Sequence, residues 1–322
     1  MTTTPSEHKH LLKGWRFTAL IATIIFSVIG YFLFTLLGGW DKVIDGITKI
    51  GIAGIILNLC ITCMSIFFRF SRWNYFLHTL GHKVPWLKSL KIYVTGFSLT
   101  TTPGKAGEAL RSVFLIDYGV SYRRSFGALL AERLSDLLAV VVLSVGGLWA
   151  YTDARPIVVL SSLFIIFVLY AVQKDNWLKS IEHWTKNKLH DRFAYIVEFI
   201  LDTVLAFRSC FSMNVLIYGT FFGSIAWAVE GIILYKVLHV LGADISLYTA
   251  IFIHAFSLLV GALTLLPGGL GGAEVTMYQL LLMNDVPTST AVTATIIVRL
   301  CTLWFAVLLG IIALPKKQIT LR

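Results

Sequence analysis

Two glutamates in this chain are each followed by an arginine 25 residues later, and each glutamate closes a short glycine-containing motif. The first motif spans residues 103–108 and is matched in this way with Arg133. The second spans residues 267–274 and is matched with Arg299. Acidic and basic side chains at repeated intervals can pair with each other, hold a charged ligand or carry a proton. The repeated spacing therefore marks both motifs as candidates for a binding site.

These residues belong to a larger set of charged side chains that lie within otherwise apolar segments. A charged group at the centre of a membrane costs about 2.5–3.5 kcal/mol, so such groups usually face a cavity or a partner. A structural interpretation is that each arginine neutralises a glutamate and ties its motif to a later helix. The set comprises Glu108, Arg111, Glu132, Arg133, Asp136, Glu230, Glu274 and Arg299.

A functional interpretation comes from the glycines beside these charges. Glycines at the start of a helix leave backbone N–H groups that can bind an anion with the help of the helix dipole. The substrate-binding residues that we predict for an anionic headgroup, of which phosphate fits best, are Lys105, Glu108, Arg111, Arg133, Gly268, Gly269, Gly271, Gly272, Glu274 and Arg299.

Three further acidic residues are predicted to support that site or to couple it to a proton: Glu132, Asp136 and Glu230. Glu132 and Asp136 are four residues apart on one helix face, where Arg133 can pair with Asp136. Glu230 has no acidic counterpart in the first half of the chain, where the matching position is near Ser65. It is the preferred candidate for a proton-linked residue, although a pairing with Arg299 would explain it equally well.

The composition assigns the chain to the integral membrane proteins. Of its 322 residues, 57% are hydrophobic and 14% are charged, and the mean hydropathy is +0.79. A soluble protein carries charge on about a quarter of its residues. The net charge of +10 fits cytoplasmic loops and anionic lipid, and no motif for nucleic-acid binding is present. Neither a metal site nor a cofactor is predicted, because Cys60 and Cys63 lack a second pair of ligands.

The hydropathy pattern predicts an all-α polytopic membrane protein with six transmembrane helices and two re-entrant helical hairpins. Each hairpin is an apolar stretch interrupted by one motif, about 90–118 and 247–283. Broken backbone at membrane depth is tolerated where it is buried in protein or lines a cavity. The six predicted spans are 17–37, 50–68, 126–150, 156–172, 212–236 and 289–313.

Lysines and arginines divide unequally between the two sides of this arrangement. With the N-terminus in the cytoplasm, the inside segments, among them the basic loop 69–91, hold 21 of them and the outside loops hold four. Positive charge favours the cytoplasmic side. The sequence thus predicts a multi-pass protein of the cytoplasmic (inner) membrane with both termini inside.

The same order of elements occurs twice, which predicts an inverted repeat within a single membrane domain, 1–322. The first unit is 17–150, the second is 156–313, and a polar segment, 173–210, forms a cytoplasmic amphipathic linker. Three crossings per unit place the second copy upside down relative to the first. Inverted repeats with broken helices near the midplane are typical of secondary transporters.

The motifs resemble those of the flippase-like family, also called the lysylphosphatidylglycerol synthase transmembrane region. The resemblance covers nearly the whole chain and rests on Pro103-Gly104-x-x-Gly107-Glu108-x-x-Arg111, on Glu132-Arg133-x-x-Asp136, and on Pro267-Gly268-Gly269-x-Gly271-x-x-Glu274 with Arg299. In larger relatives this region is joined to an aminoacyl transferase domain and moves the modified lipid. No such domain occurs in these 322 residues, so the resemblance implies a stand-alone member, a kind often associated with polyprenyl-phosphate-sugar or glycolipid pathways.

Together the residues and the resemblance predict a flippase rather than an enzyme. It would move a lipid with a phosphate headgroup, either a phospholipid or a polyprenyl-phosphate-linked carrier, between leaflets. One alternative is a membrane transferase acting on lipid-linked sugar, although no nucleophile with a base is present. Another is an accessory subunit whose partners are cell-envelope biosynthesis enzymes. The lipid, the energy source and the oligomeric state are not determined by the sequence.

Overall fold

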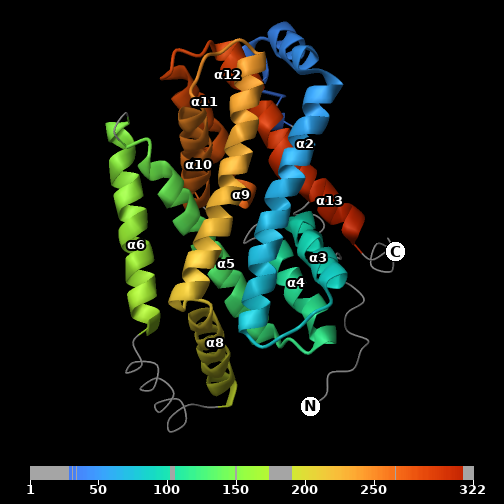
Figure 1. Cartoon of the computed structure of the whole chain (residues 1–322), viewed down its shortest axis with the longest axis vertical. Helices are drawn as coiled ribbons and strands as arrows, with labels where there is room; N and C mark the ends of the chain where they lie inside the picture. The colour runs from blue at the N-terminus through green and yellow to red at the C-terminus, as the bar shows by residue number, and fades with distance from the viewer. Residues whose placement is uncertain are drawn as a thin grey trace.

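The computed structural model describes residues 29–314 apart from 31, 34, 102–105, 149–150, 174–190 and 265. Every regular element in this part of the chain is helical, which confirms the all-α class (Figure 1). The α-helices are α2 (Trp40–Thr79), α3 (Trp86–Thr95), α4 (Ala106–Leu115), α5 (Tyr122–Val145), α6 (Arg155–Gln173), α8 (Asp191–Ser209), α9 (Met213–Val240), α10 (Leu247–Leu263), α11 (Gly272–Leu282), α12 (Thr288–Arg299) and α13 (Phe305–Ala313). Short 3-10 turns are η2 (Gly96–Leu99), η4 (Ile116–Tyr118), η5 (Thr152–Ala154) and η6 (Pro267–Gly269), and η7 (Leu300–Trp304) is a π-helix.

Four helical segments of the described chain are long and apolar enough to cross a membrane. They are Trp40–Thr79, Thr152–Gln173, Met213–Val240 and Thr288–Ala313, and they cover four of the six predicted spans. A fifth predicted span, 126–150, corresponds to α5, which is 24 residues long and carries the charged residues of the site. The first predicted span, 17–37, lies largely outside the described residues.

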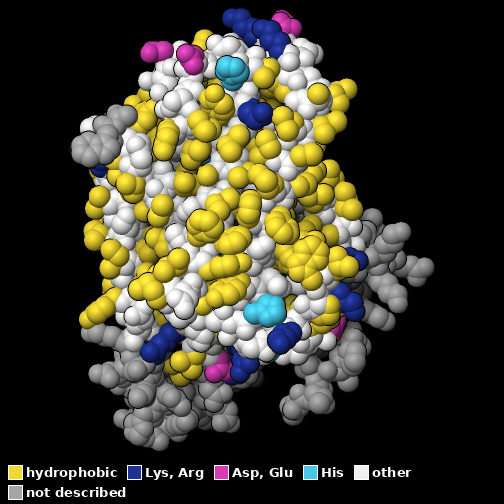
Figure 2. Space-filling model, viewed as in Figure 1, with side chains coloured by type: hydrophobic (Ala, Val, Ile, Leu, Met, Phe, Trp, Pro, Cys, Tyr) yellow, Lys and Arg dark blue, Asp and Glu magenta, His cyan; other side chains and the backbone are white. Residues whose placement is uncertain are grey.

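The outside of the helical bundle is apolar over most of its length. Figure 2 shows hydrophobic side chains covering the middle of the molecule, with charged side chains gathered toward its two ends. Large apolar residues on α6 are exposed on several sides of the helix, for example Leu160, Ile166 and Phe167. A face of this kind is stable in hydrocarbon and is avoided in water.

Both interrupted stretches form helical hairpins, and they lie at opposite ends of the bundle (Figure 1). In the first, α3 leads through η2 toward residues 102–105, which are outside the described chain, and α4 follows. In the second, α10 leads through η6 into α11. The two hairpins pack around the hydrophobic core. Helices α2, α5, α9 and α13 also contribute residues to this core.

Helix α2 is longer than its predicted span and bends once. Gly51 has φ 63° and ψ 174° within it, a conformation that favours glycine, so Trp40–Ile50 runs in a different direction from the remainder. Beyond the predicted end at residue 68, the helix continues to Thr79. The buried residues Phe70, Trp73 and Phe76 recur on one face of this extension. The prediction that 69–91 forms a basic loop on the membrane surface was therefore wrong for its first half.

The predicted amphipathic linker is described only from residue 191, where α8 begins. This helix lies at the lower end of the bundle in Figure 1 and packs against α5. A Cβ built on Gly127 of α5 would lie 2.6 Å from the Ala206 Cβ of α8, so the two backbones approach closely. An ion pair of 2.7 Å joins Arg123 to Asp202 across the same contact.

Candidate functional site

In the second glycine-containing motif, the side chain of Glu274 accepts a hydrogen bond from the backbone of the same motif. The Gly271 N–H donates to Glu274 Oε2 at 2.8 Å and so caps the first turn of α11. Gly271 has a φ of 84°, in the left-handed region that favours glycine. The Gly269 N–H donates to the Leu266 carbonyl at 2.9 Å. These two N–H groups are occupied, so the expectation that the glycines leave them open to an anion was wrong.

Arg299, at the end of α12, joins this helix to the second hairpin. Its Nε donates to Glu274 Oε1 at 2.7 Å, and its Nη2 donates to the Gly268 carbonyl at 2.9 Å. Both charged side chains are less than a tenth exposed. The predicted pairing of the second glutamate with the arginine 25 residues later is thus confirmed, and Arg299 ties the motif to α12.

Gly268 of the second hairpin lies close to Thr101 of the first and to the π-helix that follows Arg299. A Cβ built on Gly268 would lie 3.4 Å from Thr101 Cγ2 and 3.6 Å from the Leu303 methyl groups. A π-turn leaves backbone carbonyls without their usual helical partners. One of these, the Cys301 carbonyl, accepts a hydrogen bond from the Thr62 hydroxyl of α2 at 3.0 Å. A threonine side chain from α2 therefore binds this irregular backbone.

In the first half of the chain, two carboxylates on α5 share several arginines. Glu132 Oε2 accepts from Arg111 Nη1 at 2.7 Å. Arg133 Nη2 lies 3.4 Å from Glu132 Oε1 and 3.0 Å from Asp136 Oδ2, which confirms the predicted pairing along the helix. Glu132 and Arg111 are completely buried, whereas 31% of the Arg133 side chain is exposed. Arg133 is therefore the member of this group that is exposed at the surface.

Two arginines of α2 complete the group, and neither was among the predicted site residues. Arg72 is completely buried, and its Nη2 lies 2.5 Å from Asp136 Oδ1 and 3.8 Å from Glu132 Oε1. Arg69 Nη2 donates to Glu230 Oε1 at 2.7 Å. A signal was present in the sequence, because Arg69 and Arg72 continue the helical spacing of Ser65 beyond the end of the apolar run.

The Glu230 carboxylate of α9 binds side chains of α2 through one oxygen and faces α10 with the other. Its Oε1 accepts from the Ser65 hydroxyl and from Arg69, both at 2.7 Å. Its Oε2 lies 3.5 Å from His254 Nε2. The alternative in which Glu230 pairs with Arg299 is not realised, since the carboxylate takes these partners instead.

These side chains form one connected network, which we call the buried charge cluster. Besides the ion pairs, the Trp227 indole N–H donates to Asp136 Oδ1 at 3.2 Å, and the Arg69 guanidinium lies 4.8 Å from the Trp227 ring. The cluster therefore extends without a break from Glu230 of α9 to Arg111 of α4. Its charged members are Arg69, Arg72, Arg111, Glu132, Arg133, Asp136 and Glu230.

Aromatic rings surround Arg111 at one end of the cluster. The centre of its guanidinium lies 4.1 Å from the Tyr93 ring, 5.2 Å from the Trp73 ring and 5.5 Å from the Phe97 ring. Each of these faces attracts a cation. The Tyr93 hydroxyl also donates to Glu132 Oε1 at 3.0 Å. Arg111 is thus held in a fixed orientation by both its carboxylate and its aromatic neighbours.

Several guanidinium N–H groups of the cluster have no hydrogen-bond acceptor within the described part of the chain. These buried atoms are Nε and Nη1 of Arg72 and Nε and Nη2 of Arg111. A buried donor left without an acceptor costs about 1–3 kcal/mol, and more when it carries charge. Native proteins satisfy nearly all such groups, so an arginine pair of this kind is the feature expected where an anion binds.

The remaining predicted site residues fall at the limit of the described chain. Lys105 lies outside the described residues, and only the backbone of Glu108 is described, within α4. The structure therefore brings together Arg111, Arg133, Glu132 and Asp136 in one cluster. It places Glu274 and Arg299 with their glycines in a second group at the tip of the other hairpin.

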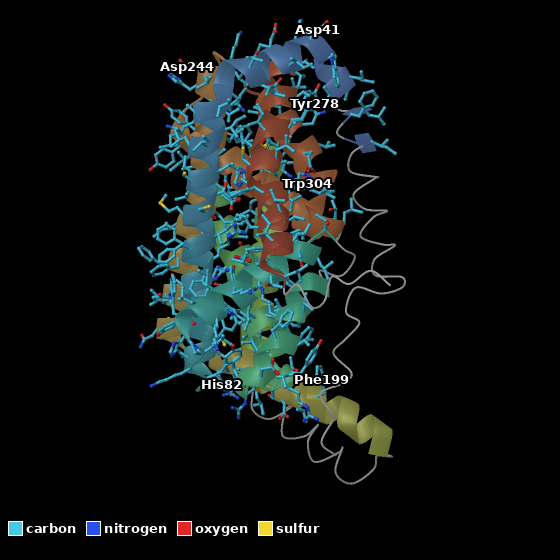
Figure 3. All side chains as sticks on the ribbon, turned by 90° about the vertical axis from the view of Figure 1, so that its right-hand side faces the viewer. Asp41, His82, Phe199, Asp244, Tyr278 and Trp304 are labelled. Carbon is cyan, nitrogen blue, oxygen red and sulfur yellow. The ribbon has the colours of Figure 1, made fainter. Side chains whose placement is uncertain are left out.

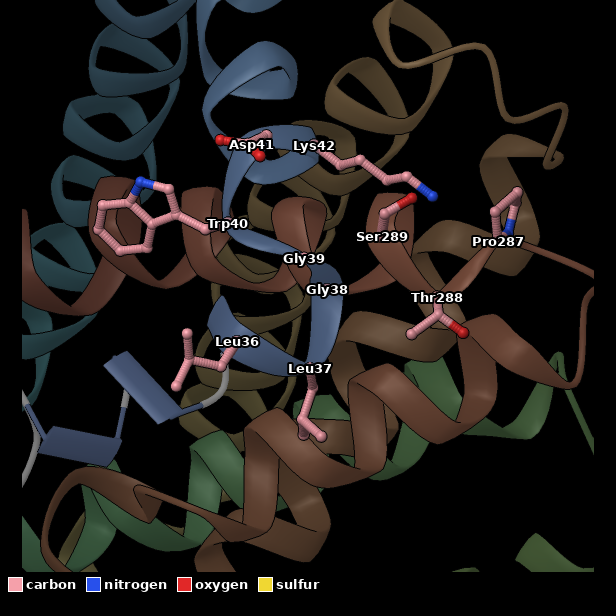
Figure 4. Close-up of a pocket in the computed structure, with 10 residues that line it drawn as sticks. All are labelled: Leu36, Leu37, Gly38, Gly39, Trp40, Asp41, Lys42, Pro287, Thr288 and Ser289. Carbon is pink, nitrogen blue, oxygen red and sulfur yellow. The ribbon is translucent and has the colours of Figure 1, made fainter.

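A shallow pocket at the end of the molecule is separate from both groups. It lies between the start of α2 and the start of α12 and is lined by residues such as Lys42 and Ser289 (Figure 4). Asp41, another lining residue, sits at the extreme end of the bundle, whereas Trp304 lies near its middle (Figure 3). The pocket contains no buried charged residue, so it is not the candidate site.

Apolar spanning helices with an ionic network buried between them define a multi-pass membrane protein with a polar site in its interior. Residues 17–310 match the family described as the lysylphosphatidylglycerol synthase transmembrane region, and the chain belongs to that family.

Proteins similar to this chain occur in two archaea. A UPF0104 membrane protein of Pyrococcus horikoshii is 24% identical over 321 residues, which cover 90% of this chain and 96% of that protein. A UPF0104 membrane protein of Methanothermobacter thermautotrophicus is 26% identical over 242 residues, covering 68% of this chain and 71% of that protein. These names agree with a stand-alone membrane member of the family.

Proposed function

We propose that the protein is a lipid flippase that binds an anionic headgroup at the buried charge cluster and moves the lipid between leaflets. The observation that carries this proposal is the set of guanidinium N–H groups on Arg72 and Arg111 that lack an acceptor. They lie inside a bundle whose exterior is apolar, so the ligand must combine an anionic group with a hydrocarbon part. A lipid with a phosphate headgroup has both.

Arginine suits this ligand better than lysine does. Its planar guanidinium presents a fixed fork of donors that matches two oxygens of a phosphate. Arg72 and Arg111 each bind the α5 carboxylates through one nitrogen and keep other nitrogens free of acceptors. Glu132 and Asp136 would then hold the arginines in place and lower the cost of burying four like charges.

Access to the cluster would begin at Arg133, whose side chain is 31% exposed. Arg72 and Arg111 are completely buried behind it, so a headgroup can reach them only after the helices move. Alternating access around a central site is the usual solution in transporters built from inverted repeats. The reaction would be translocation alone, without a covalent step.

The hairpins supply the elements that would move. In this proposal the units 17–150 and 156–313 are inverted repeats, and both hairpins are re-entrant. Support comes from their positions at opposite ends of the bundle (Figure 1) and from the nearness of Thr101 to Gly268, since a Cβ built on Gly268 would lie 3.4 Å from Thr101 Cγ2.

The distribution of surface charge supports a cytoplasmic position for the end that carries His82, opposite Asp41 and Asp244 in Figure 3. The described residues toward the His82 end include Lys83, Lys88, Lys91, Arg123 and Arg124. At the other end, acidic residues such as Asp41 and Asp45 stand beside the lysines of α2. Under the positive-inside rule this charge distribution supports a cytoplasmic position for the His82 end. The membrane that we propose for the protein is the inner membrane.

A translocation assay tests the proposal. The purified protein is reconstituted in vesicles with fluorescent phosphatidylglycerol, and a membrane-impermeant quencher reports how much label reaches the outer leaflet. We expect translocation by the native protein and a decrease of about tenfold or more for Arg133→Gln. Arg123→Gln, which changes another arginine of α5 outside the cluster, is the matched control and should leave the rate unchanged.

Two results would contradict the flippase. One is a rate in vesicles with native protein that equals the rate in empty vesicles for both phosphatidylglycerol and a polyprenyl phosphate. The other is product formation from a lipid-linked sugar in detergent, where no second compartment exists, which would favour the transferase.

A further inference from the structure

His254, a buried histidine on α10, has no hydrogen-bond partner among the described residues, and it faces the Glu230 carboxylate of the buried charge cluster. The His254 side chain is completely buried, and neither ring nitrogen has a hydrogen-bond partner. Its Nε2 lies 3.5 Å from Glu230 Oε2, which is longer than a good hydrogen bond between these atoms. A buried polar ring without partners is uncommon and calls for an explanation.

Glu230 has a carboxylate oxygen on the side facing His254 that can accept a hydrogen bond. Ser65 and Arg69 both bind its Oε1 at 2.7 Å, so one carboxylate oxygen carries two donors. Its Oε2 has only the distant imidazole. The carboxylate therefore keeps an acceptor site directed at His254, the residue type whose charge changes between about pH 5 and pH 8.

We infer that His254 and Glu230 form a proton-binding site whose occupancy controls anion binding at Arg72 and Arg111. This inference rests on the proposed function and deepens it, because it names the ion that is coupled to the lipid. The proton would bind His254 Nε2, and the resulting N–H would donate to Glu230 Oε2. No other bond forms or breaks.

The coupling path runs through Arg69. With a neutral histidine, Glu230 neutralises Arg69 alone; with a charged histidine, it is shared between two cations. Arg69 also lies over the Trp227 ring at 4.8 Å, and Trp227 donates to Asp136 Oδ1 at 3.2 Å. Asp136 in turn binds Arg72, one of the two arginines with unpaired donors. The added charge on His254 is thus five contacts away from Arg72, and Arg69 is three contacts away from it.

The sign of the coupling follows from charge. A proton on His254 makes the cluster more positive, so an anion binds more tightly as the pH falls. Because linkage is reciprocal, binding of the anion must also favour uptake of the proton. Proton and anionic lipid would therefore move through the bundle together.

The carboxylates on α11 and α5, two helices that pack against α10, are paired with arginines. On α11, Glu274 binds Arg299, and on α5, Glu132 and Asp136 bind Arg111 and Arg72. Among the described residues, Glu230 is the one carboxylate within salt-bridge distance of the imidazole. A pH effect that disappears on substitution of His254 is accordingly assigned to this pair.

The test measures binding of fluorescent phosphatidylglycerol to the purified protein from about pH 5.5 to about pH 8.5. This phosphodiester keeps a constant charge over that range, so the probe itself does not titrate. We expect the affinity of the native protein to rise about tenfold toward the acidic end, within the usual size of coupling between sites. In His254→Gln the affinity should be independent of pH and close to the native value at about pH 8.5.

His239→Gln is the matched control, since His239 is an exposed histidine in the last turn of α9. It should retain the full pH dependence. A measurement on native protein does not depend on any variant folding: addition of phosphatidylglycerol in weak buffer near neutral pH should raise the pH, because protons are taken up.

Affinity of the native protein that does not change with pH, or binding without proton uptake, would overturn the coupling and leave the flippase intact. Retention of the pH dependence in a folded His254→Gln protein would overturn the assignment to this pair. Absence of phosphatidylglycerol binding at every pH would count against the proposed function itself and remove the coupling with it.

Discussion

Ser65 of α2 donates a hydrogen bond of 2.7 Å to Glu230 of α9, and the two residues are 165 positions apart in the chain. This offset is close to the 166 positions that separate Arg133 from Arg299. In an assembly with two-fold pseudosymmetry, equivalent residues touch only near the symmetry axis. The contact is the one expected near the axis of the inverted repeat that we propose, which would pass between α2 and α9 beside the buried charge cluster.

The ion pair between Arg299 and Glu274 gives the first prediction. Arg299→Ala should abolish translocation and lower the melting temperature, because a buried carboxylate is left without its cation at a cost of about 3–5 kcal/mol. Thermal unfolding in detergent measures the loss of stability, and the vesicle assay measures transport.

A second substitution separates the two effects of Arg299→Ala. Adding Glu274→Gln should recover part of the stability, because the unpaired charge is gone, while transport remains absent. If the double variant were less stable than the single one, the pairing would not be the reason for the loss.

The room around the Arg111 guanidinium depends on a glycine. A Cβ at Gly96 would overlap Arg111 Nε, so Gly96→Ala must displace the arginine from its position. We expect a loss of about 1–3 kcal/mol in stability, as is usual for overpacking, together with loss of phosphatidylglycerol binding. Gly146→Ala is the control, since the nearest atom to its Cβ is 4.0 Å away. Equal behaviour of the two variants would contradict this account of the site.

The geometry of the guanidinium, beyond its charge, should matter at Arg111. Arg111→Lys keeps the positive charge and the contact with Tyr93 but removes the fork of donors. We expect phosphatidylglycerol to raise the melting temperature of the native protein and to have much less effect on the variant. At a ligand concentration 100 times the dissociation constant, the native protein gains about 2.7 kcal/mol. An equal shift for both proteins would show that charge alone suffices.

Outside the membrane, His82 is predicted to resist protonation. Partial burial, and then the nearby Arg124 guanidinium, lower the pKa of His82 below its ordinary value; Arg124 Nη1 lies 3.3 Å from His82 Nε2. A pKa that is lower in the folded than in the unfolded protein contributes stability above about pH 6.5 that is lost as the pH falls toward the folded value. Arg124→Gln should therefore raise the pKa of His82, as measured by NMR of labelled histidine. An unchanged pKa would exclude the arginine as a cause.

Much of the fold could be predicted from the sequence, because length, hydropathy and breaks in apolar stretches are local properties. The pairing of Glu274 with Arg299 was also predictable, since both residues lie in regular positions after matching motifs. The C-terminal end of α2, at Thr79, could not be predicted in this way. An apolar run ends where charged residues begin, and only partners on other helices show that Arg69 and Arg72 continue into the interior.

The sequence by itself determined that this chain forms helices within a membrane, that two of its stretches are broken by glycine, and that charged residues lie inside apolar segments. These conclusions depend on composition and spacing along one chain. Which charges meet was decided only by the tertiary structure, because an ion pair needs two groups within about 4 Å, and helix packing sets that distance. The structure joined Arg72 to Asp136 across 64 residues and placed His254 against Glu230. It thereby gathered, from α2, α4, α5, α9 and α10, the charges from which the proposed function is argued.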